Sequence, residues 1–141
     1  VNIGEETIKR STLSDWVIGS NINLEKSLKV GDEISGHFVY GHVDMVIKII
    51  DIKNNHNSWD FEFSLSNLNK QPQLKKLLAE KGSVSINGIS LTVANVSDNS
   101  FNVSVIPHTF DKTNLSSLKT SAKVNLEFDI FARYISRLYE K

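Results

Sequence analysis

A repeat within the chain constrains its fold more than any other feature of the sequence. Residues 103–127 match residues 1–25 without a gap, at an offset of 102 positions. Seven of the 25 aligned pairs are identical, whereas chance would give roughly one or two, and such self-similarity marks a duplicated structural unit. The identical pairs are Val1/Val103, Thr7/Thr109, Leu13/Leu115, Ser14/Ser116, Asn23/Asn125, Leu24/Leu126 and Glu25/Glu127.

The repeat also predicts how the chain is divided. Because the first copy begins at the first residue, we expect a fragment that holds the end of one module and one complete second module. The best boundary between the two is the segment 28–31, Leu-Lys-Val-Gly. We therefore expect residues 1–28 to be the remnant of a truncated first module, residues 29–128 a second module, and residues 129–141 a C-terminal helix.

Charge and composition exclude several classes of partner. Sixteen basic and sixteen acidic residues cancel, whereas a nucleic-acid surface usually needs a basic excess. The chain has no cysteine, which excludes disulfides and thiolate metal sites. No apolar run approaches the ~20 residues of a membrane span. We expect a cytoplasmic protein that binds neither nucleic acid, nor a membrane, nor a metal.

Short strand patterns dominate the sequence. Apolar and polar residues alternate from Trp59 to Leu65, which places one set of side chains on one face of a sheet. Asn87-Gly88 joins two such runs and is typical of a two-residue hairpin turn. Many short strands and a repeated unit predict an all-β, antiparallel barrel. The expected strands are residues 36–44, 45–52, 59–65, 82–86, 89–96, 101–106 and 122–128.

Only two segments have a helical pattern. Pro72 suits a first helical turn, and Leu74, Leu77 and Leu78 form an apolar stripe before Gly82. The C-terminal segment places Ile130, Phe131, Tyr134, Ile135 and Leu138 on one face. A helix of about twelve residues is marginal alone in water, so we expect this face to dock on the barrel or on another subunit.

Two histidines are candidates for proton transfer. Gly36-His37 and Gly41-His42 are the same step, five residues apart. On an unbroken strand the two imidazoles would point to opposite faces, whereas a bulge at either glycine would bring both toward one cavity. Histidine is the natural proton carrier near neutral pH. A hydrogen-bonded structural role for one of them is the alternative.

Hydroxyl and carboxylate side chains complete the candidate chemistry. Ser90 and Thr92 are two apart on one expected strand, so both hydroxyls face the same side and suit a polar heterocycle. Simple solvent exposure on a strand is the alternative for both. Asp129 follows the last expected strand, where the first copy of the repeat has Ser27. It is either part of a specialised site or the cap of the C-terminal helix.

Four segments together resemble the α-type riboflavin synthase family. They are residues 35–44, 81–93, 106–109 and 124–134, in collinear order over nearly the whole chain. The resemblance implies duplicated six-stranded Greek-key β-barrels, each a lumazine-binding module, and a C-terminal helix that joins three chains into a homotrimer. It also implies a transferase of riboflavin biosynthesis that dismutates two molecules of 6,7-dimethyl-8-ribityllumazine by four-carbon transfer, without a cofactor.

The resemblance also implies which residues act. Catalytic positions would be His37, His42, Lys81, Ser90, Thr92 and Asp129. Substrate contacts in the second module would be Gly41, His42, Val43, Lys81, Ser90, Leu91, Thr92, Ser104, Val105, Ile106, Pro107, His108 and Thr109. In the first module they would be Asn2, Ile3, Gly4, Glu5, Glu6 and Thr7.

The reaction implied by the resemblance needs two bound substrates. A chain with one complete module lacks half of such a site, so this chain alone is an inactive fragment under that interpretation.

Two other functions remain open at this point. A non-catalytic lumazine- or flavin-binding protein of the antenna type would share the fold. A β-barrel that serves only assembly would bind neither compound.

Overall fold

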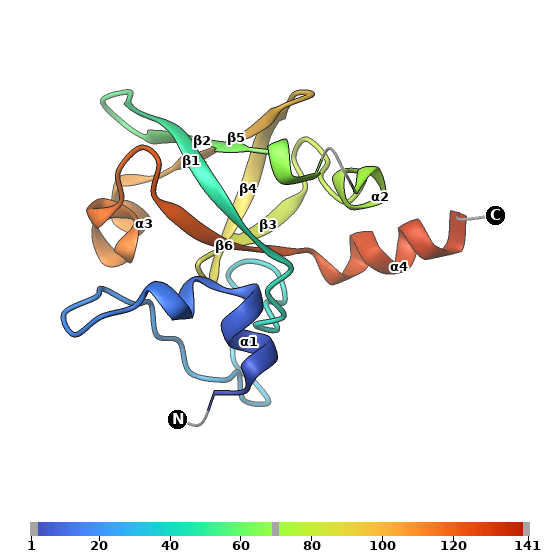
Figure 1. The fold of residues 1–141 in the computed structure, drawn as a ribbon, viewed down its shortest axis with the longest axis horizontal. Coiled ribbons are helices and arrows are strands. Elements are labelled where there is room, and N and C mark those ends of the chain that lie inside the picture. The colour runs from blue at the N-terminus through green and yellow to red at the C-terminus, as the bar shows by residue number, and fades with distance from the viewer. Residues whose placement is uncertain (1–2, 69–70, 140–141) are drawn as a thin grey trace.

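The computed structural model describes residues 3–68 and 71–139. At its centre six antiparallel strands close into a barrel, in the order β1-β2-β5-β4-β3-β6 (Figure 1). β2 pairs with β5 and β3 with β6, so the connectivity is not a simple meander. The predicted all-β class and six-stranded barrel are confirmed. The strands are β1 (Met45–Asn54), β2 (Trp59–Ser64), β3 (Ser83–Ile86), β4 (Ile89–Val96), β5 (Ser100–Val105) and β6 (Lys123–Phe128).

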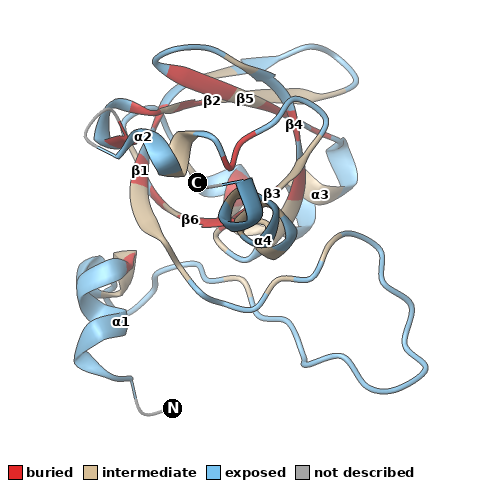
Figure 2. Cartoon of the chain, turned by 90° about the vertical axis from the view of Figure 1, so that its right-hand side faces the viewer, coloured by how far each residue is buried: buried red, intermediate tan, exposed pale blue. Residues whose placement is uncertain are grey.

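The alternation read from the sequence places the core inside this barrel. Phe61, Phe63 and Leu65 are fully buried, as are Phe101 and Val103 on the neighbouring strand β5. Burying each of these side chains contributes roughly 1.5–3 kcal/mol. The buried residues therefore follow the strands of the barrel, as Figure 2 shows in red.

The hairpin between β3 and β4 has the predicted turn. Asn87 and Gly88 both adopt positive φ, at 50° and 81°, and Ile86 pairs with Ile89 across them. Two positive φ values are the requirement of a type I′ turn, which twists in the same sense as the strands it joins. This turn fixes the register that places Ser83 opposite Thr92.

The prediction of a strand over residues 36–44 is wrong. The backbone of residues 35–44, here called the crossing segment, is irregular, and pairing with β6 begins only at Met45. Gly41 has φ +73°, outside the strand region, and interrupts the extended path. Side chains of the barrel take the place of a strand ladder, because Ser90 accepts a hydrogen bond from the backbone of His37 and Glu127 one from Tyr40.

The helices depart further from the sequence prediction. α4 (Ile130–Tyr139) is confirmed, and it extends away from the barrel in Figure 1. The other predicted helix is only one turn, α2 (Pro72–Lys75); tighter turns follow it and bury Leu77 and Leu78 against the barrel core. No described helix has the length and apolar character needed to cross a bilayer. Further helices were not predicted: α1 (Glu5–Arg10), α3 (Pro107–Lys112), η1 (Thr12–Asp15), η2 (Ser66–Leu68) and η3 (Asn114–Ser117).

The two copies of the repeat have the same local structure. α1 with η1 and α3 with η3 begin and end at positions that differ by the offset of the sequence repeat. The residue between the helices is Ser11 in one copy and Thr113 in the other, with φ −127° and −124°. Each hydroxyl donates to a carbonyl four residues earlier, at 2.6 Å and 2.7 Å. The similarity of the two segments therefore extends from sequence to backbone and side-chain contacts.

Reciprocal contacts hold the N-terminal copy against the barrel. Asn125 Oδ1 accepts from the backbone nitrogen of Thr12, and Asn23 Oδ1 accepts from that of Asn114, both at 2.7 Å. The two bonds join equivalent positions of the two copies, as an internal two-fold arrangement would. Asp15 pairs with Lys123 at 2.8 Å, and this hydrogen bond, with the charge of Lys123, holds the pKa of the Asp15 carboxyl below its ordinary value.

The segment that follows η1, residues 16–34, is largely exposed. Val17, Ile18 and Val30 are more than 70% exposed, and the long pale-blue loop in Figure 2 lies outside the barrel. The predicted boundary at residues 28–31 falls within this segment of irregular structure. The division of the chain into modules at that point remains a prediction.

Candidate functional site

Two cavities border the crossing segment. The first, called here the β4 cavity, has a volume of about 330 Å³ and meets the segment at Ser35 and Gly36. The second, called the His42 cavity, has a volume of about 420 Å³ and is lined by residues 40–44 of the same segment. Residues predicted from the sequence to form one site are thus divided between two hollows.

Strands β4 and β5 form the β4 cavity. Ser90 and Thr92 point out of the barrel while Leu91 and Val93 are buried, which confirms the facing of this strand predicted from its alternation. The cavity wall carries hydroxyl groups beside apolar side chains, so it offers both hydrogen bonds and a surface for a ring. Besides Ser35 and Gly36, its lining residues are Ser83, Ser90, Leu91, Thr92, Ser104, Val105, Ile106 and Thr109.

Helix α3 closes one side of this cavity because aromatic stacking fixes it to the barrel. The ring of Phe110 lies parallel to that of Trp59, with 4.0 Å between centroids, and also contacts Phe61. Such stacking adds about 0.5–1.5 kcal/mol to the burial of the rings. The helix thereby holds Thr109 at the cavity, immediately before Phe110.

His37 and Ser90 form the closest polar contact at the β4 cavity. Ser90 Oγ lies 2.6 Å from Nδ1 of His37 and 3.1 Å from its backbone nitrogen. Nε2 of His37 is buried and has no hydrogen-bond partner among the described residues. A larger residue in place of the neighbouring Gly36 would clash with Ser90, because its Cβ atom would lie 2.4 Å from Ser90 Oγ. The contact therefore needs a glycine before the histidine.

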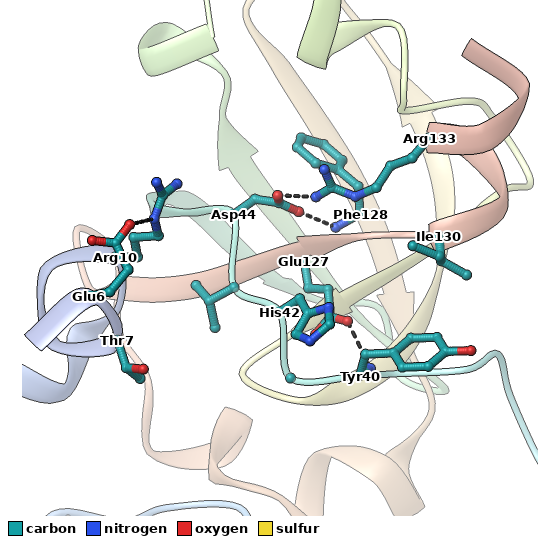
Figure 3. A pocket seen from close by; sticks show the side chains of 12 residues that line it. Glu6, Thr7, Arg10, Tyr40, His42, Asp44, Glu127, Phe128, Ile130 and Arg133 are labelled. Carbon is teal, nitrogen blue, oxygen red and sulfur yellow. Dashed lines mark hydrogen bonds and ion pairs between the residues drawn. The ribbon is translucent and has the colours of Figure 1, made fainter. Parts of the chain in front are cut away.

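The His42 cavity lies between α1, the crossing segment and the start of α4 (Figure 3). The rings of Tyr40 and His42 stack with 5.9 Å between centroids. Asp44 forms an ion pair with Arg133 and accepts a hydrogen bond from the backbone of Phe128 at 2.9 Å. On the opposite wall Glu6 forms an ion pair with Arg10. The cavity thus combines an aromatic pair with two carboxylate–guanidinium pairs.

Comparison with known proteins identifies the barrel. Residues 40–129 match the family model described as the lumazine binding domain. The chain belongs to the lumazine-binding-domain family. The predicted resemblance is thereby confirmed, and the matched range covers all six strands.

Several proteins similar to this chain are named riboflavin synthase. The proteins of Actinobacillus pleuropneumoniae and Brucella abortus are each 41% identical to this chain, over 99% and 100% of its length. The protein of Bacillus subtilis is 35% identical over the whole chain. The chain spans 63%, 68% and 63% of the lengths of these three relatives.

Solved structures of LumP have a fold similar to that of this chain. LumP complexed with 6,7-dimethyl-8-(1'-D-ribityl) lumazine superposes with a TM-score of 0.74 at 20% identity, over 90% of this chain and 70% of that one. LumP complexed with riboflavin gives a TM-score of 0.74 at 19% identity, over 87% and 64%. At this level of identity the likeness concerns the fold of the lumazine-binding barrel.

Of the 21 predicted site residues, 13 lie at one or the other of the two cavities. Those at the β4 cavity are Ser90, Leu91, Thr92, Ser104, Val105, Ile106 and Thr109, with His37 on Ser90. Those at the His42 cavity are Gly41, His42, Val43, Glu6 and Thr7. The two histidines are therefore separated: His42 lines the His42 cavity, whereas His37 contacts Ser90 and is not a lining residue of either cavity. Asn2 lies outside the described residues.

Other predicted residues line neither cavity. Asp129 Oδ1 accepts from the backbone nitrogen of Phe131 at 3.0 Å, which is the geometry of a helix cap and favours the structural alternative. Lys81 has φ +65° and its backbone nitrogen donates to Val93 at the start of the β3 hairpin, while its side chain is exposed. Absent from both linings as well are Ile3, Gly4, Glu5, Pro107 and His108.

The sequence prediction missed the residues that hold the crossing segment. Asp44 and Glu127 stand within the segments that carry the family resemblance, but no local pattern connects them to their partners. Glu127 is only 6% exposed and binds Tyr40, which lies 87 positions earlier. A glutamate at an otherwise apolar end of β6, between Leu126 and Phe128, was the available signal.

Proposed function

We propose that the protein to which this chain belongs is a riboflavin synthase. It dismutates two molecules of 6,7-dimethyl-8-ribityllumazine to riboflavin and 5-amino-6-ribitylamino-pyrimidinedione by four-carbon transfer. The observation that carries this proposal is 35–41% identity to riboflavin synthases across essentially the whole chain. The hydroxyl-lined β4 cavity on the outside of the lumazine-binding barrel supports it.

The β4 cavity supplies the contacts that one lumazine needs. Backbone groups and hydroxyls of Ser90 and Thr92 pair with the pyrimidine edge of the ring, and the exposed Ile106 offers apolar contact to it. The hydroxyls of Ser83, Ser104 and Thr109 bind the ribityl chain, a polyol that donates and accepts hydrogen bonds.

Proton transfer falls to His37 and Ser90. The C7 methyl group of the lumazine is acidic because its anion delocalises into the heterocycle, so a modest base is sufficient. His37 and Ser90 already share a short hydrogen bond at the cavity, and Nε2 of His37 has its hydrogen-bonding capacity unused by the described residues. This geometry supports the pair as the proton carrier more than it supports Asp129 or Lys81.

The reaction needs a second lumazine held against the first. Fixing two large rings in reactive orientation removes much of the entropic barrier, and we propose that a second barrel supplies the opposite position. We further propose that the exposed apolar residues of α4, among them Phe131, Tyr134 and Leu138, join three chains of a cytoplasmic protein. Sedimentation of the intact protein as a monomer would exclude the homotrimer.

A direct assay tests the proposed function. The complete protein is incubated with 6,7-dimethyl-8-ribityllumazine while riboflavin is followed by absorbance; we expect one riboflavin for every two lumazines consumed. Ser90→Ala and His37→Gln should each lower kcat by about 100-fold. A wild-type protein that forms trimers and yields no riboflavin would contradict the proposal.

A non-catalytic carrier is the second candidate. It is favoured by the likeness of the fold to LumP, whose structures hold a lumazine or a flavin. The complete protein would then bind lumazine tightly, with no change in the lumazine concentration over hours. The assay above therefore separates the two candidates.

A further inference from the structure

Asp44 lies where three elements of the molecule meet. Its backbone nitrogen donates to Leu126 of β6 at 2.8 Å, and its Oδ2 accepts from Phe128 at 2.9 Å. Its Oδ1 forms an ion pair with Arg133 of α4 (Figure 3). The Asp44 side chain is only 12% exposed. A carboxylate so far removed from water needs a positive partner, because an unpaired buried charge is strongly destabilising.

The residues before Asp44 depend on such side-chain anchors. The backbone from Tyr40 to Asp44 makes no strand ladder, and Gly41 allows it to turn. One end of this stretch is held by the Glu127 carboxylate, which accepts from Tyr40 at 2.8 Å, and the other by Asp44. His42 stands midway between the two anchors. Its position in the cavity therefore follows from where the two carboxylates hold the chain.

Arg133 connects this arrangement to the C-terminal helix. Asp129 caps the first turn of α4, and Arg133 lies one turn further along on the side that faces Asp44. The opposite part of α4 is exposed, with Phe131 at 58% and Leu138 at 82%. A guanidinium can bind a carboxylate through two nitrogens, so such a pair fixes the relative orientation of the two groups as well as balancing their charges.

We propose that Arg133 and Asp44 are positioning residues: the ion pair seats residues 40–44 against β6 and orients His42, so that the placement of α4 and the geometry of the His42 cavity are coupled. This inference adds to the proposed function two residues that touch no reacting atom. Together with the proposed function, it also predicts that a substitution of Arg133, a residue of α4, changes the rate of the reaction.

The test uses the four histidines of the chain as probes. The Cε1–H signals of His37, His42, His56 and His108 are recorded by NMR, with His42 assigned from His42→Gln. In Arg133→Met and in Asp44→Asn we expect the His42 signal to shift while that of His56, in the distant β1–β2 turn, stays in place. Arg133→Lys, which keeps the charge, should restore part of the shift.

Lys123→Met is the matched control, because it also removes an ion pair between two elements, that with Asp15, but touches no residue of the crossing segment. It should leave the His42 signal unchanged. An unmoved His42 signal in Arg133→Met, or an equal shift in the control, would overturn the inference. If Arg133→Met does not fold, an unmoved His42 signal in Asp44→Asn, which removes the same ion pair from the other side, has the same consequence.

Kinetics provide the second measurement. In the complete protein, Arg133→Met should lower kcat about tenfold with a KM close to that of the wild type. The crossing segment also carries His37, the proposed proton carrier, and its misplacement affects the rate more than binding. A change confined to KM would contradict a positioning role. A wild-type protein without activity would count against the proposed function alone, because the NMR result does not depend on turnover.

Discussion

At the scale of single residues, the Ser90 hydroxyl is shared between the backbone nitrogen and the Nδ1 atom of His37. A lumazine in the β4 cavity would compete for the same oxygen. The sequence predicted that Ser90 and Thr92 face the same side, since alternation on a strand is a local property. It did not predict the contact with His37, because that contact depends on the path of an irregular segment 53 positions away.

Replacement of Ser90 by alanine tests the binding role directly. A typical hydrogen bond contributes about 0.5–1.5 kcal/mol, so we expect Ser90→Ala to weaken lumazine binding by roughly three- to tenfold with little change in thermal stability. Fluorescence titration measures the Kd and calorimetry the Tm. Thr120→Ala, in the exposed turn before β6, is the control and should change neither. Equal losses of affinity and Tm in Ser90→Ala would indicate a structural role.

At the scale of elements, the strands were predictable and the short helices were not. The alternation of apolar and polar residues predicts β2 and β4, and the residue pair Asn87-Gly88 predicts the turn. α1 and α3 have six residues each, too few for an apolar stripe. The hydroxyls of Ser11 and Thr113 bond to carbonyls of these helices, and Phe110 also stacks α3 on the barrel. Residues 36–44 contain many strand formers, but Gly41 and the Glu127 side chain direct them along another path.

The β3–β4 hairpin gives a prediction at this scale. Gly88→Ala should lower the free energy of unfolding by about 1–2 kcal/mol, because alanine is strained at a φ of +81°. Gly88→Asn should cost less, since asparagine tolerates this region. Urea denaturation compares the two variants with the wild type. An alanine variant as stable as the wild type would mean that the turn changes its conformation at no cost.

At the scale of the whole molecule, two similar segments meet through reciprocal contacts. The repeat was visible in the sequence, but the bonds from Thr12 to Asn125 and from Asn114 to Asn23 were not. The burial of the two copies also differs: Leu115 is fully buried, whereas Leu13 is half-buried, because the complete barrel covers only the second copy. The position of His42 in its cavity likewise follows from distant contacts, such as those of Glu127 and Arg133.

Mapping the bound ligand on this chain tests the central claim most directly. Backbone amide signals of the isotope-labelled protein are followed by NMR as 6,7-dimethyl-8-ribityllumazine is added. We predict that the largest shifts occur at Ser90, Leu91, Thr92 and residues 104–109, together with the displaced His37. Shifts confined to residues distant from the β4 cavity, or no saturable shifts at any concentration of the lumazine, would contradict the account.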